Sequence, residues 1–241
     1  MRYKLTFTYD GTNYFGYAKQ VGQLGIQEVI EKVLFTIFQE EITLNASGRT
    51  DKGVHALNQV AHFDAKKDIE INKLMCSLNK LLPDDIYVKN VEKVDDNFHA
   101  RFNVKKKCYK YLINLKEYNP LRRNYEYFVF NLDINKMLEA SKIFIGTHNY
   151  QNFTSKETDE DGFIRTIYEI NFNIKDDILE IEFIGDGFMR YEIRKIVGSL
   201  IEVGRNKITK EELLIYLNSK ERKIISYQAP SKGLYLVRPI Y

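Results

Sequence analysis

Residues 48–56 read Gly48-Arg49-Thr50-Asp51-Lys52-Gly53-Val54-His55-Ala56 and place one carboxylate between two basic side chains and between two glycines. Glycine lets the backbone approach a ligand closely and tolerates a positive φ. Arg49 and Lys52 would keep Asp51 ionised, because a nearby opposite charge favours the charged form of a carboxyl group. An ionised carboxylate in a basic setting can act as a covalent nucleophile and can receive a phosphate-bearing substrate, although the same residues also suit an ordinary turn.

The flanking sequence predicts strands and helices in the order βαββαβ. Apolar residues alternate from Tyr3 to Tyr9, which indicates a half-buried strand, and they recur at helical spacing over residues 26–38. A short strand is expected over 42–47 and a longer one over 55–64. A helix over 71–82 is stopped by Pro83, and a strand follows over 86–94. This is the order of a ferredoxin-like arrangement.

The second part of the chain predicts a similar order without visible sequence identity to the first. Strands are expected over 109–115, 168–174, 179–183 and 234–240, and helices over 133–146, over 188–203 and from Thr209 onward. No linker rich in proline, glycine or serine separates the parts. We therefore expect an α+β fold made of an N-terminal ferredoxin-like half (1–104) and a C-terminal one (105–241).

Composition restricts the function classes. The 241 residues are 44% hydrophobic and 29% charged, which is typical of a globular protein. The net charge is only +3, so an anionic partner has to be met by a local basic patch. Cys76 and Cys108 fit no metal or redox spacing, and the four histidines show no ligand spacing. With no apolar leader and no stretch of membrane-spanning length, we expect a cytoplasmic protein without a metal or cofactor.

The nonapeptide around Asp51 resembles the active-site signature of the TruA-type tRNA pseudouridine synthases, in which GRTD, then Ala or Lys, then GVHA surround one essential aspartate. Four more blocks resemble that family. Residues 9–17 resemble its YDGTxYxGWQ opening, with Tyr17 for Trp and Ala18 for Gln. Residues 185–198 resemble GxGFLxxMVRxxVG, and residues 100–111 resemble ARF…RxYxY, with Cys108 at a commonly basic position. Residues 148–153 resemble HDFxxF, with Asn149 for Asp. The C-terminal block, from Ala229-Pro230 to Tyr241, matches as well, so the resemblance spans the chain.

The resemblance implies roles for particular residues. Asp51 would be the nucleophile, at C1′ or at C6 of the target uridine, and Arg194 would pair with it. Tyr109 would pack on the uracil, and Leu234 would line the uracil pocket. Arg49 could fill the space that the flipped base leaves, or grip a phosphate. Without the resemblance, Arg194 would be read as a solvated helix residue and Tyr109 as core. Arg190 falls inside the apolar arc of its expected helix, which indicates a functional or ion-paired role that the sequence does not specify.

The resemblance also implies a fold and a substrate. The two halves would form a continuous mixed, mainly antiparallel sheet with helices on one side and a basic cleft. The activity would be the isomerisation of uridine to pseudouridine at positions 38–40 in the anticodon arm of tRNA, without a cofactor, by a homodimer that needs no membrane. Candidate phosphate contacts are Lys105, Lys106, Lys107, Arg122, Arg123, Arg205, Lys207 and the run from Lys220 to Lys223.

Three other functions stay open at this point. A paralogous pseudouridine synthase could act on another RNA site, and the substitutions at Tyr17 and Asn149 keep that reading open. A non-catalytic RNA-binding protein could share the fold. A nucleoside hydrolase that uses Asp51 is less favoured, because the sequence supplies no base or metal to activate water.

Overall fold

The structure is a computed structural model that describes residues 1–158 and 162–241. These residues form two compact units, Met1–Lys105 with Tyr235–Tyr241, and Lys106–Leu234. The junction after Lys105 lies one residue from the expected division at 104/105. The closing strand, which we expected in the second half, lies with the first unit. It does so because β10 (Leu234–Ile240) pairs in parallel with β3 (His55–Asp64), with Tyr235 opposite His55.

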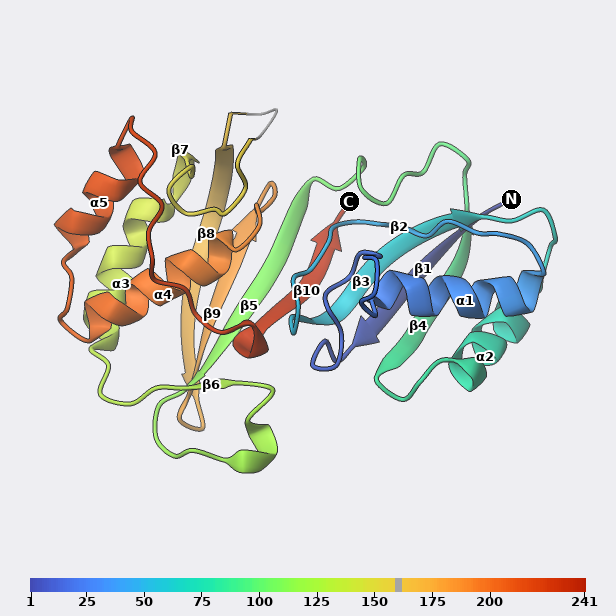
Figure 1. Cartoon of the computed structure of the whole chain (residues 1–241), viewed down its shortest axis with the longest axis horizontal. Helices are drawn as coiled ribbons and strands as arrows, with labels where there is room; N and C mark the ends of the chain where they lie inside the picture. Colours follow the sequence, from blue (N-terminus) through green and yellow to red (C-terminus); the bar gives the residue numbers. More distant parts are fainter. Residues whose placement is uncertain (159–161) are drawn as a thin grey trace. The chain divides into compact units, whose positions relative to one another are not determined.

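The first unit has the expected βαββαβ order, and β10 joins it from the end of the chain. Its sheet runs β4-β1-β3-β10, with β2 paired to β3. Both helices lie in front of these strands in Figure 1. The bounds are β1 (Arg2–Tyr9), α1 (Ile26–Phe38), β2 (Asn45–Ala46), β3 (His55–Asp64), α2 (Ile71–Leu81) and β4 (Ile86–Val94).

The core of the first unit follows from the alternation in β1. Every second residue of that strand is buried, from Tyr3 to Tyr9. The ring of Tyr3 stacks on Phe63 of β3 with 5.2 Å between the ring centroids, and Phe38 at the end of α1 packs against both. The apolar face of α1 therefore closes on the apolar face of the sheet, as the two periodicities predict.

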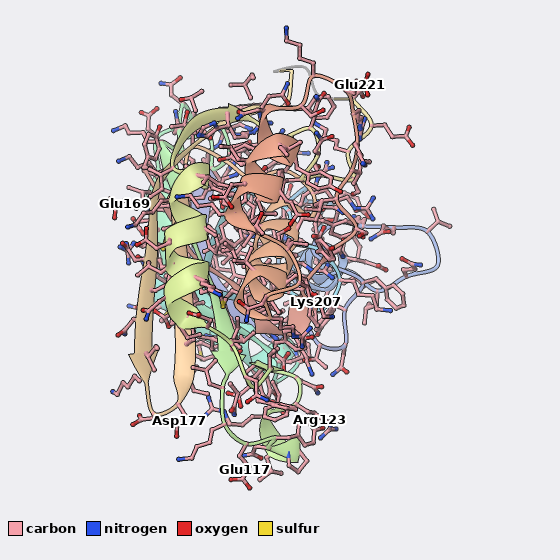
Figure 2. The ribbon with its side chains drawn as sticks, turned by 90° about the vertical axis from the view of Figure 1, so that its left-hand side faces the viewer. Glu117, Arg123, Glu169, Asp177, Lys207 and Glu221 are labelled. Atoms are coloured by element: carbon pink, nitrogen blue, oxygen red, sulfur yellow. The ribbon has the colours of Figure 1, made fainter. Side chains whose placement is uncertain are left out.

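The second unit has a sheet of order β5-β9-β8-β7, with β6 paired in parallel to β5. In Figure 2 the helices of this unit lie to one side of its strands. The bounds are β5 (Lys106–Asn114), β6 (Tyr127–Phe128), α3 (Ile134–Ser141), β7 (Gly146–Asn149), β8 (Ile164–Lys175), β9 (Ile178–Gly185), α4 (Glu192–Gly204), α5 (Lys210–Asn218) and the 3-10 turns Pro120–Arg122, Lys142–Phe144 and Ser231–Gly233.

The start of α4 differs from the expectation. The sequence predicts this helix from residue 188, but it begins at Glu192, because Tyr191 has a left-handed backbone with a φ of 65° that an α-helix cannot continue. The Glu192 carboxylate accepts the N–H of Met189 at 2.8 Å and so satisfies one backbone donor before the helix begins. The expected wheel position of Arg190 was therefore wrong, since Arg190 precedes the helix.

The α+β class is confirmed, and so is the mixed, mainly antiparallel pairing. The strands β1, β3 and β4 pair antiparallel, as do β5, β7, β8 and β9, while β10 on β3 and β6 on β5 are parallel. The capping box at the start of α5, between Thr209 and Glu212, is also confirmed. Among residues 1–158 and 162–241, none of the helices has the length and apolarity to cross a bilayer.

Candidate active site

Asp51 lies in the loop between β2 and β3 and is partly buried. The loop turns at Gly53, whose φ is 73°, and the N–H of Val54 donates to the carbonyl of Asp51 at 3.1 Å. This closed turn holds the backbone of Asp51 immediately before the buried start of β3. The sequence prediction of a glycine-bracketed turn around one carboxylate is confirmed in this respect.

Three residues of the first unit, Tyr9, Gly16 and Tyr17, contact Thr50 and so hold the Asp51 loop in place. The hydroxyl of Tyr9, at the end of β1, lies 2.7 Å from that of Thr50, and burial raises the pKa of Tyr9 to about 12. The N–H of Tyr17 donates to the carbonyl of Thr50 at 3.0 Å. Gly16, with a φ of 98°, lies against the same carbonyl: a Cβ there would stand 2.7 Å from the oxygen. These contacts hold the backbone of Thr50, which directly precedes Asp51.

The two basic residues beside Asp51 differ in their surroundings. Arg49 is exposed, and Lys52 is exposed with its ammonium 3.8 Å from the centroid of the Phe15 ring. A cation over an aromatic face gains electrostatic stabilisation from the ring quadrupole. Lys52 is therefore drawn toward the 12–16 turn, and Arg49 is the basic neighbour that reaches into solvent.

Tyr109 and Leu234, the predicted uracil contacts, both lie in the second unit and are 7% and 6% exposed. Tyr109 is on β5 and meets Phe188 edge to face, with 5.3 Å between the ring centroids. Leu234 follows the 3-10 turn Ser231–Gly233, which lies against the ring of Tyr111. The Tyr111 hydroxyl donates to the carbonyl of Pro230 at 2.7 Å, which ties this turn to β5.

Arg194 lies in the first turn of α4 and is partly buried. Its Nε donates to the carbonyl of Ala229 at 2.8 Å, while the N–H of Ala229 donates to the carbonyl of Arg194, also at 2.8 Å. Burial raises the pKa of Tyr111 well above its usual value, and the positive charge of Arg194 opposes that rise. Arg194 thus keeps a packed stem, which is the placement that the edge of an amphipathic helix predicts.

The sequence analysis missed Tyr191, beside Arg194, and left the role of Arg190 unassigned. The Tyr191 ring contacts two guanidinium groups, with the Arg190 carbon 4.8 Å and the Arg194 carbon 5.0 Å from its centroid. Arg190 also donates to the Tyr191 hydroxyl at 2.9 Å. These contacts give Arg190 a position beside the ring that supports Arg194. The sequence periodicity does not predict these contacts, because the three residues meet through the left-handed backbone of Tyr191.

The candidate phosphate contacts near β5 are lysines at the start of the strand and arginines on the loop that follows it. Lys105 is exposed, and Lys106 lies 4.5 Å from the centroid of the Tyr168 ring. On the loop after β5, Arg122 pairs with Glu126 at 2.9 Å, and Arg123, labelled in Figure 2, donates to the carbonyl of Pro120 at 3.0 Å. Lys107 is partly buried.

The remaining basic candidates surround α5. Arg205 and Lys207 both pair with Glu202, at 2.9 and 3.2 Å, and Lys223 lies 5.7 Å from the centroid of the Tyr216 ring. Arg222 donates to the carbonyl of Glu157 at 2.6 Å. Exposed pairs of this kind contribute about 0–1 kcal/mol, so a phosphate can replace the partner at little cost.

The departures from the family motifs at Tyr17 and Cys108 are buried. Tyr17 is 2% exposed beneath the Asp51 loop, so it serves the core of the first unit rather than an open stacking surface. The Cys108 thiol donates to Glu182 on β9 at 3.2 Å, which directs this side chain along the sheet.

The structure therefore divides the predicted site between the units. The first carries Arg49, Asp51 and Lys52; the second carries Tyr109, Arg194 and Leu234. The pairing of Asp51 with Arg194, and the uracil pocket between Tyr109 and Leu234, stay predictions.

Comparison with known proteins gives concordant matches over the whole chain. A family model described as tRNA pseudouridine synthase matches residues 6–103 and 140–241. A tRNA pseudouridine synthase A of Geobacillus sp. (strain WCH70) is 40% identical over 243 residues, covering 100% of this chain and 98% of the relative. The enzyme of that name from Thermoanaerobacter sp. (strain X514) is 41% identical over 235 residues (97% and 96%), and that of Bacillus subtilis (strain 168) is 39% identical over 245 residues (100% and 99%).

Among solved structures, the chain is similar to one in a crystal structure of a Cbf5-Nop10-Gar1 complex. The identity is 12%, the TM-score is 0.38, and the match covers 97% of this chain and 57% of the other. A likeness of that size supports no argument about the site.

Proposed function

The chain belongs to the tRNA pseudouridine synthase family, and on that premise we propose that Asp51 is the nucleophile with which it isomerises uridine to pseudouridine in the anticodon arm of tRNA. The observation that carries the proposal is the match of the whole chain to that family at about 40% identity, together with the intact nonapeptide around Asp51. The comparisons do not favour a non-catalytic RNA-binding role or a paralogous activity. The target positions, 38–40, remain part of the proposal.

The reaction breaks the N1–C1′ bond of a uridine, turns the base, and forms a C5–C1′ bond; C5 loses a proton and N1 gains one. The atoms balance within the substrate, so the groups needed are a nucleophile, a cation that keeps it ionised, and surfaces that hold the base. Asp51 attacks at C1′ or at C6. Arg194 orients the carboxylate, and Tyr109 and Leu234 hold the uracil.

The surroundings of these residues support the assigned roles. The turn around Asp51 is closed by the Val54 N–H and anchored through Thr50, so the carboxylate stands on a fixed backbone. Arg194 is fixed by Ala229 and by the Tyr191 ring, which limits the rotamers of a side chain that has to meet an anion. A catalytic group held this way loses less conformational freedom on reaction.

For the enzyme to reach a uridine inside an RNA stem, the base has to leave the stack, which costs a few kcal/mol. Arg49 is exposed beside Asp51, so it can fill the vacated position or hold a phosphate. We further propose that the exposed residues Lys105, Arg122 and Arg123, together with Lys106 and Lys107, contact tRNA phosphates. Each such contact should contribute about −0.7 to −0.9 to the slope of log K against log salt concentration.

We also propose that the protein acts in the cytoplasm as a homodimer. The composition and the few cysteines support the compartment, and similarity to the relatives along the full chain supports a shared assembly. Sedimentation equilibrium of the pure protein tests the dimer directly, and a monomer at micromolar concentration would contradict it.

Incubation with unmodified tRNA transcripts, followed by carbodiimide treatment and primer extension, tests the function. Wild type should introduce pseudouridine in the anticodon arm, and Asp51→Asn should lower the rate by at least about 10⁴-fold, because it removes the nucleophile and keeps the shape. Asp84→Asn is the matched control, since Asp84 is an exposed carboxylate between α2 and β4. An active Asp51→Asn enzyme would refute the assignment; modification outside the anticodon arm would refute the target.

A further inference from the structure

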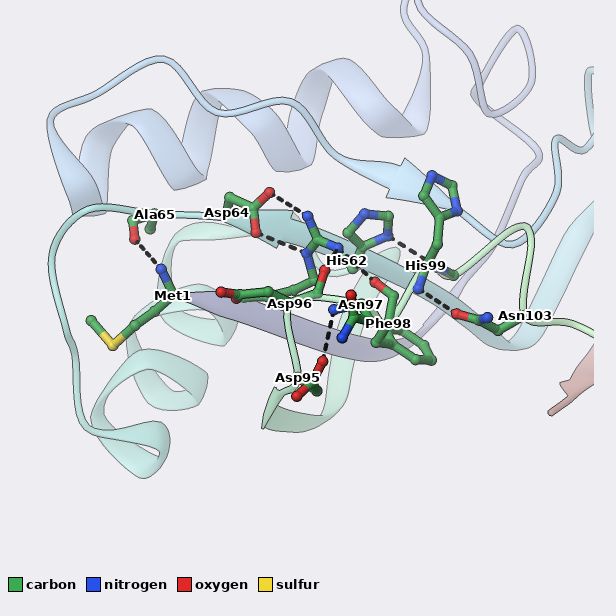
Figure 3. A network of polar contacts seen from close by, with 12 residues as sticks. Met1, His62, Asp64, Ala65, Asp95, Asp96, Asn97, Phe98, His99 and Asn103 are labelled. Carbon is green, nitrogen blue, oxygen red and sulfur yellow. Dashed lines mark hydrogen bonds and ion pairs between the residues drawn. The ribbon is translucent and has the colours of Figure 1, made fainter.

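The loop of residues 95–103, between β4 and β5, is irregular, but most of its backbone N–H groups are hydrogen-bonded within the protein. All seven backbone N–H groups from Asn97 to Asn103 donate to protein acceptors: Asn97 and Phe98 to Asp95, His99 to the Asn103 side chain, Ala100 to His62 Nδ1, Arg101 and Phe102 to His99 Nδ1, and Asn103 to the carbonyl of His99. Figure 3 shows several of these bonds. A loop with most of its donors satisfied has little freedom to rearrange.

Groups from the strands fasten this loop to the first unit. Arg2 on β1 forms a two-pronged pair with Asp64 and donates to the carbonyls of Asp96 and Phe98. The Tyr241 hydroxyl donates to the carbonyl of Ala100 at 2.8 Å. The tip of the loop, residues 101–103, follows these anchors and is exposed at every position.

The tip presents an aromatic ring to solvent. Phe102 is 76% exposed, although the loop that carries it is fixed. The His99 ring packs against the Phe102 ring, with 4.2 Å between the ring centroids. The buried His62 ring packs against His99 in turn, with 4.6 Å between their centroids. The Arg101 guanidinium carbon lies 5.8 Å from the centroid of the same ring. A ring on a fixed support loses little conformational freedom when it binds, so this ring is preorganised for a planar ligand.

We propose that Phe102 is a stacking platform for an unpaired nucleobase of the tRNA substrate, with Arg101 and Lys105 meeting the phosphates beside it. This inference rests on the proposed function, because it takes RNA as the ligand. The chemistry is that of single-strand recognition, in which aromatic rings stack on exposed bases while cations follow the backbone. Phe102 is not among the residues to which the proposed function assigns the reaction, so the role of the platform is to bind substrate and not to take part in bond making.

Charge favours RNA over a second copy of the chain as the occupant. Arg101 directly precedes Phe102, and Lys105 follows it three residues later; both are basic and exposed. A stack on one base is worth about 5- to 150-fold in affinity. A protein interface would instead need a wider apolar surface than one ring.

A single-tryptophan variant tests the contact directly. The chain contains no tryptophan, so Phe102→Trp introduces the only one, at a position where the larger ring has room. Its fluorescence should be quenched when unmodified tRNA is added, because a stacked base quenches indole emission. Phe35→Trp, at another exposed phenylalanine of the first unit, on α1, is the matched control and should not be quenched. Equal quenching at both positions, or none at 102, would overturn the platform.

Affinity measurements separate stacking from charge. Phe102→Ala should weaken tRNA binding about 5- to 150-fold with an unchanged slope against salt, and Phe102→Tyr should restore it. Arg101→Gln should instead reduce that slope by about one phosphate contact. In turnover, Phe102→Ala should raise KM and leave kcat unchanged. Wild-type affinity in Phe102→Ala would refute the proposal, and if the sedimenting mass changed as well, the ring would belong to a dimer interface.

Failure of the platform can be told from failure of the proposed function. Quenching and affinity need no chemistry, so they can support the platform even if wild type forms no pseudouridine. Conversely, an active enzyme whose Phe102→Ala variant binds tRNA normally would keep the proposed function and lose the platform.

Discussion

The turn that carries Asp51 in the first unit and the segment 186–191 that precedes Arg194 in the second are built in different ways. The first is fixed by backbone contacts: the Thr50 carbonyl accepts the Tyr17 N–H, and Gly16 lies against that carbonyl. The second is fixed by side chains, since Tyr191 lies against the guanidinium groups of Arg190 and Arg194. A glycine takes the positive φ in the first segment, and a tyrosine takes it in the second.

This difference determines which substitutions disturb each of the two proposed catalytic groups, Asp51 and Arg194. A segment held by close backbone approach fails when any side chain is added at the point of contact. A segment held by a stack fails when the ring is removed, and it tolerates changes of shape elsewhere. The left-handed backbone of Tyr191 costs about 1–3 kcal/mol of strain, which leads to the hypothesis that its ring is functional.

The largest effect is expected from Gly16→Ala. The new Cβ would lie 2.7 Å from the Thr50 oxygen and 3.2 Å from the Asp51 carbonyl carbon, at a φ of 98°. We expect a loss of about 3 kcal/mol in the free energy of unfolding and a fall in kcat of about 100-fold, because the turn must move. Urea unfolding and single-turnover rates measure the two effects.

Gly22→Ala is the control for that experiment. Gly22 also has a positive φ, of 73°, but a Cβ there meets no atom within 4 Å among the described residues. It should cost about 1 kcal/mol and leave kcat unchanged. Equal losses of kcat in both variants would show that the close contact with Thr50 does not position Asp51.

Sequence patterns predicted the first segment better than the second for a physical reason. The alternation of β1, the spacing of α1 and the glycines around Asp51 are local, and they survive folding unchanged. The start of α4 was misplaced because the apolar spacing continues through residues 188–191 while the backbone does not. The two-residue strand β6 and the four-residue strand β7 were missed, since they are too short to show a period.

The support of the 95–103 loop was also beyond prediction. His62 lies on β3 and reads as one more strand residue, yet its Nδ1 accepts the N–H of Ala100, 38 positions away. Contacts between a strand side chain and a distant loop backbone leave no pattern in the sequence. The resemblance to a family marked residues 100–102 as a block, but it did not say that Phe102 is exposed.

A pH series should distinguish the buried polar supports of the first unit from the stack of the second. Burial, aided by the charges of His99 and Arg2, lowers the pKa of His62 to about 4 from the usual histidine value of 6.5. Between pH 6.5 and 4 the unfolded chain binds a proton there and the folded chain does not, so the free energy of unfolding falls as the pH falls. We expect a loss of about 2–3 kcal/mol from this residue between pH 7 and pH 4.5.

His62→Gln tests that assignment, because its amide oxygen can still accept the Ala100 N–H but does not titrate. The decline of stability over the same pH range should shrink by that amount, as measured by urea unfolding. If wild type and variant lost stability in parallel, His62 would not be the titrating group. The stack of Tyr191 with two guanidinium groups should be insensitive to this range, since arginine stays charged throughout.

Removing the ring at Tyr191 should lower kcat by about 5-fold and leave KM unchanged, because Arg194 loses a contact worth about 1 kcal/mol that orients it. Tyr191→Phe keeps the ring and should retain most of the activity. Tyr191→Gly removes the ring together with the backbone strain, so its kcat should fall as far as that of Tyr191→Ala, but the protein should be more stable. A Tyr191→Ala enzyme with wild-type kcat would show that Ala229 alone positions Arg194.

The smallest effect is expected from Tyr9→Phe, which removes the hydrogen bond to Thr50 and retains the buried ring. The free energy of unfolding should fall by about 1 kcal/mol, the usual worth of one such bond, and kcat should change less than about threefold. The reason is that the Thr50 carbonyl still accepts the Tyr17 N–H, so the backbone of the Asp51 turn stays in place without the hydroxyl. Urea unfolding and single-turnover rates on the same preparations compare this variant with Tyr191→Ala. If Tyr9→Phe lowered kcat as much as Tyr191→Ala does, the turn of Asp51 would depend on a side-chain contact as much as Arg194 does, and the distinction between the two segments would be lost.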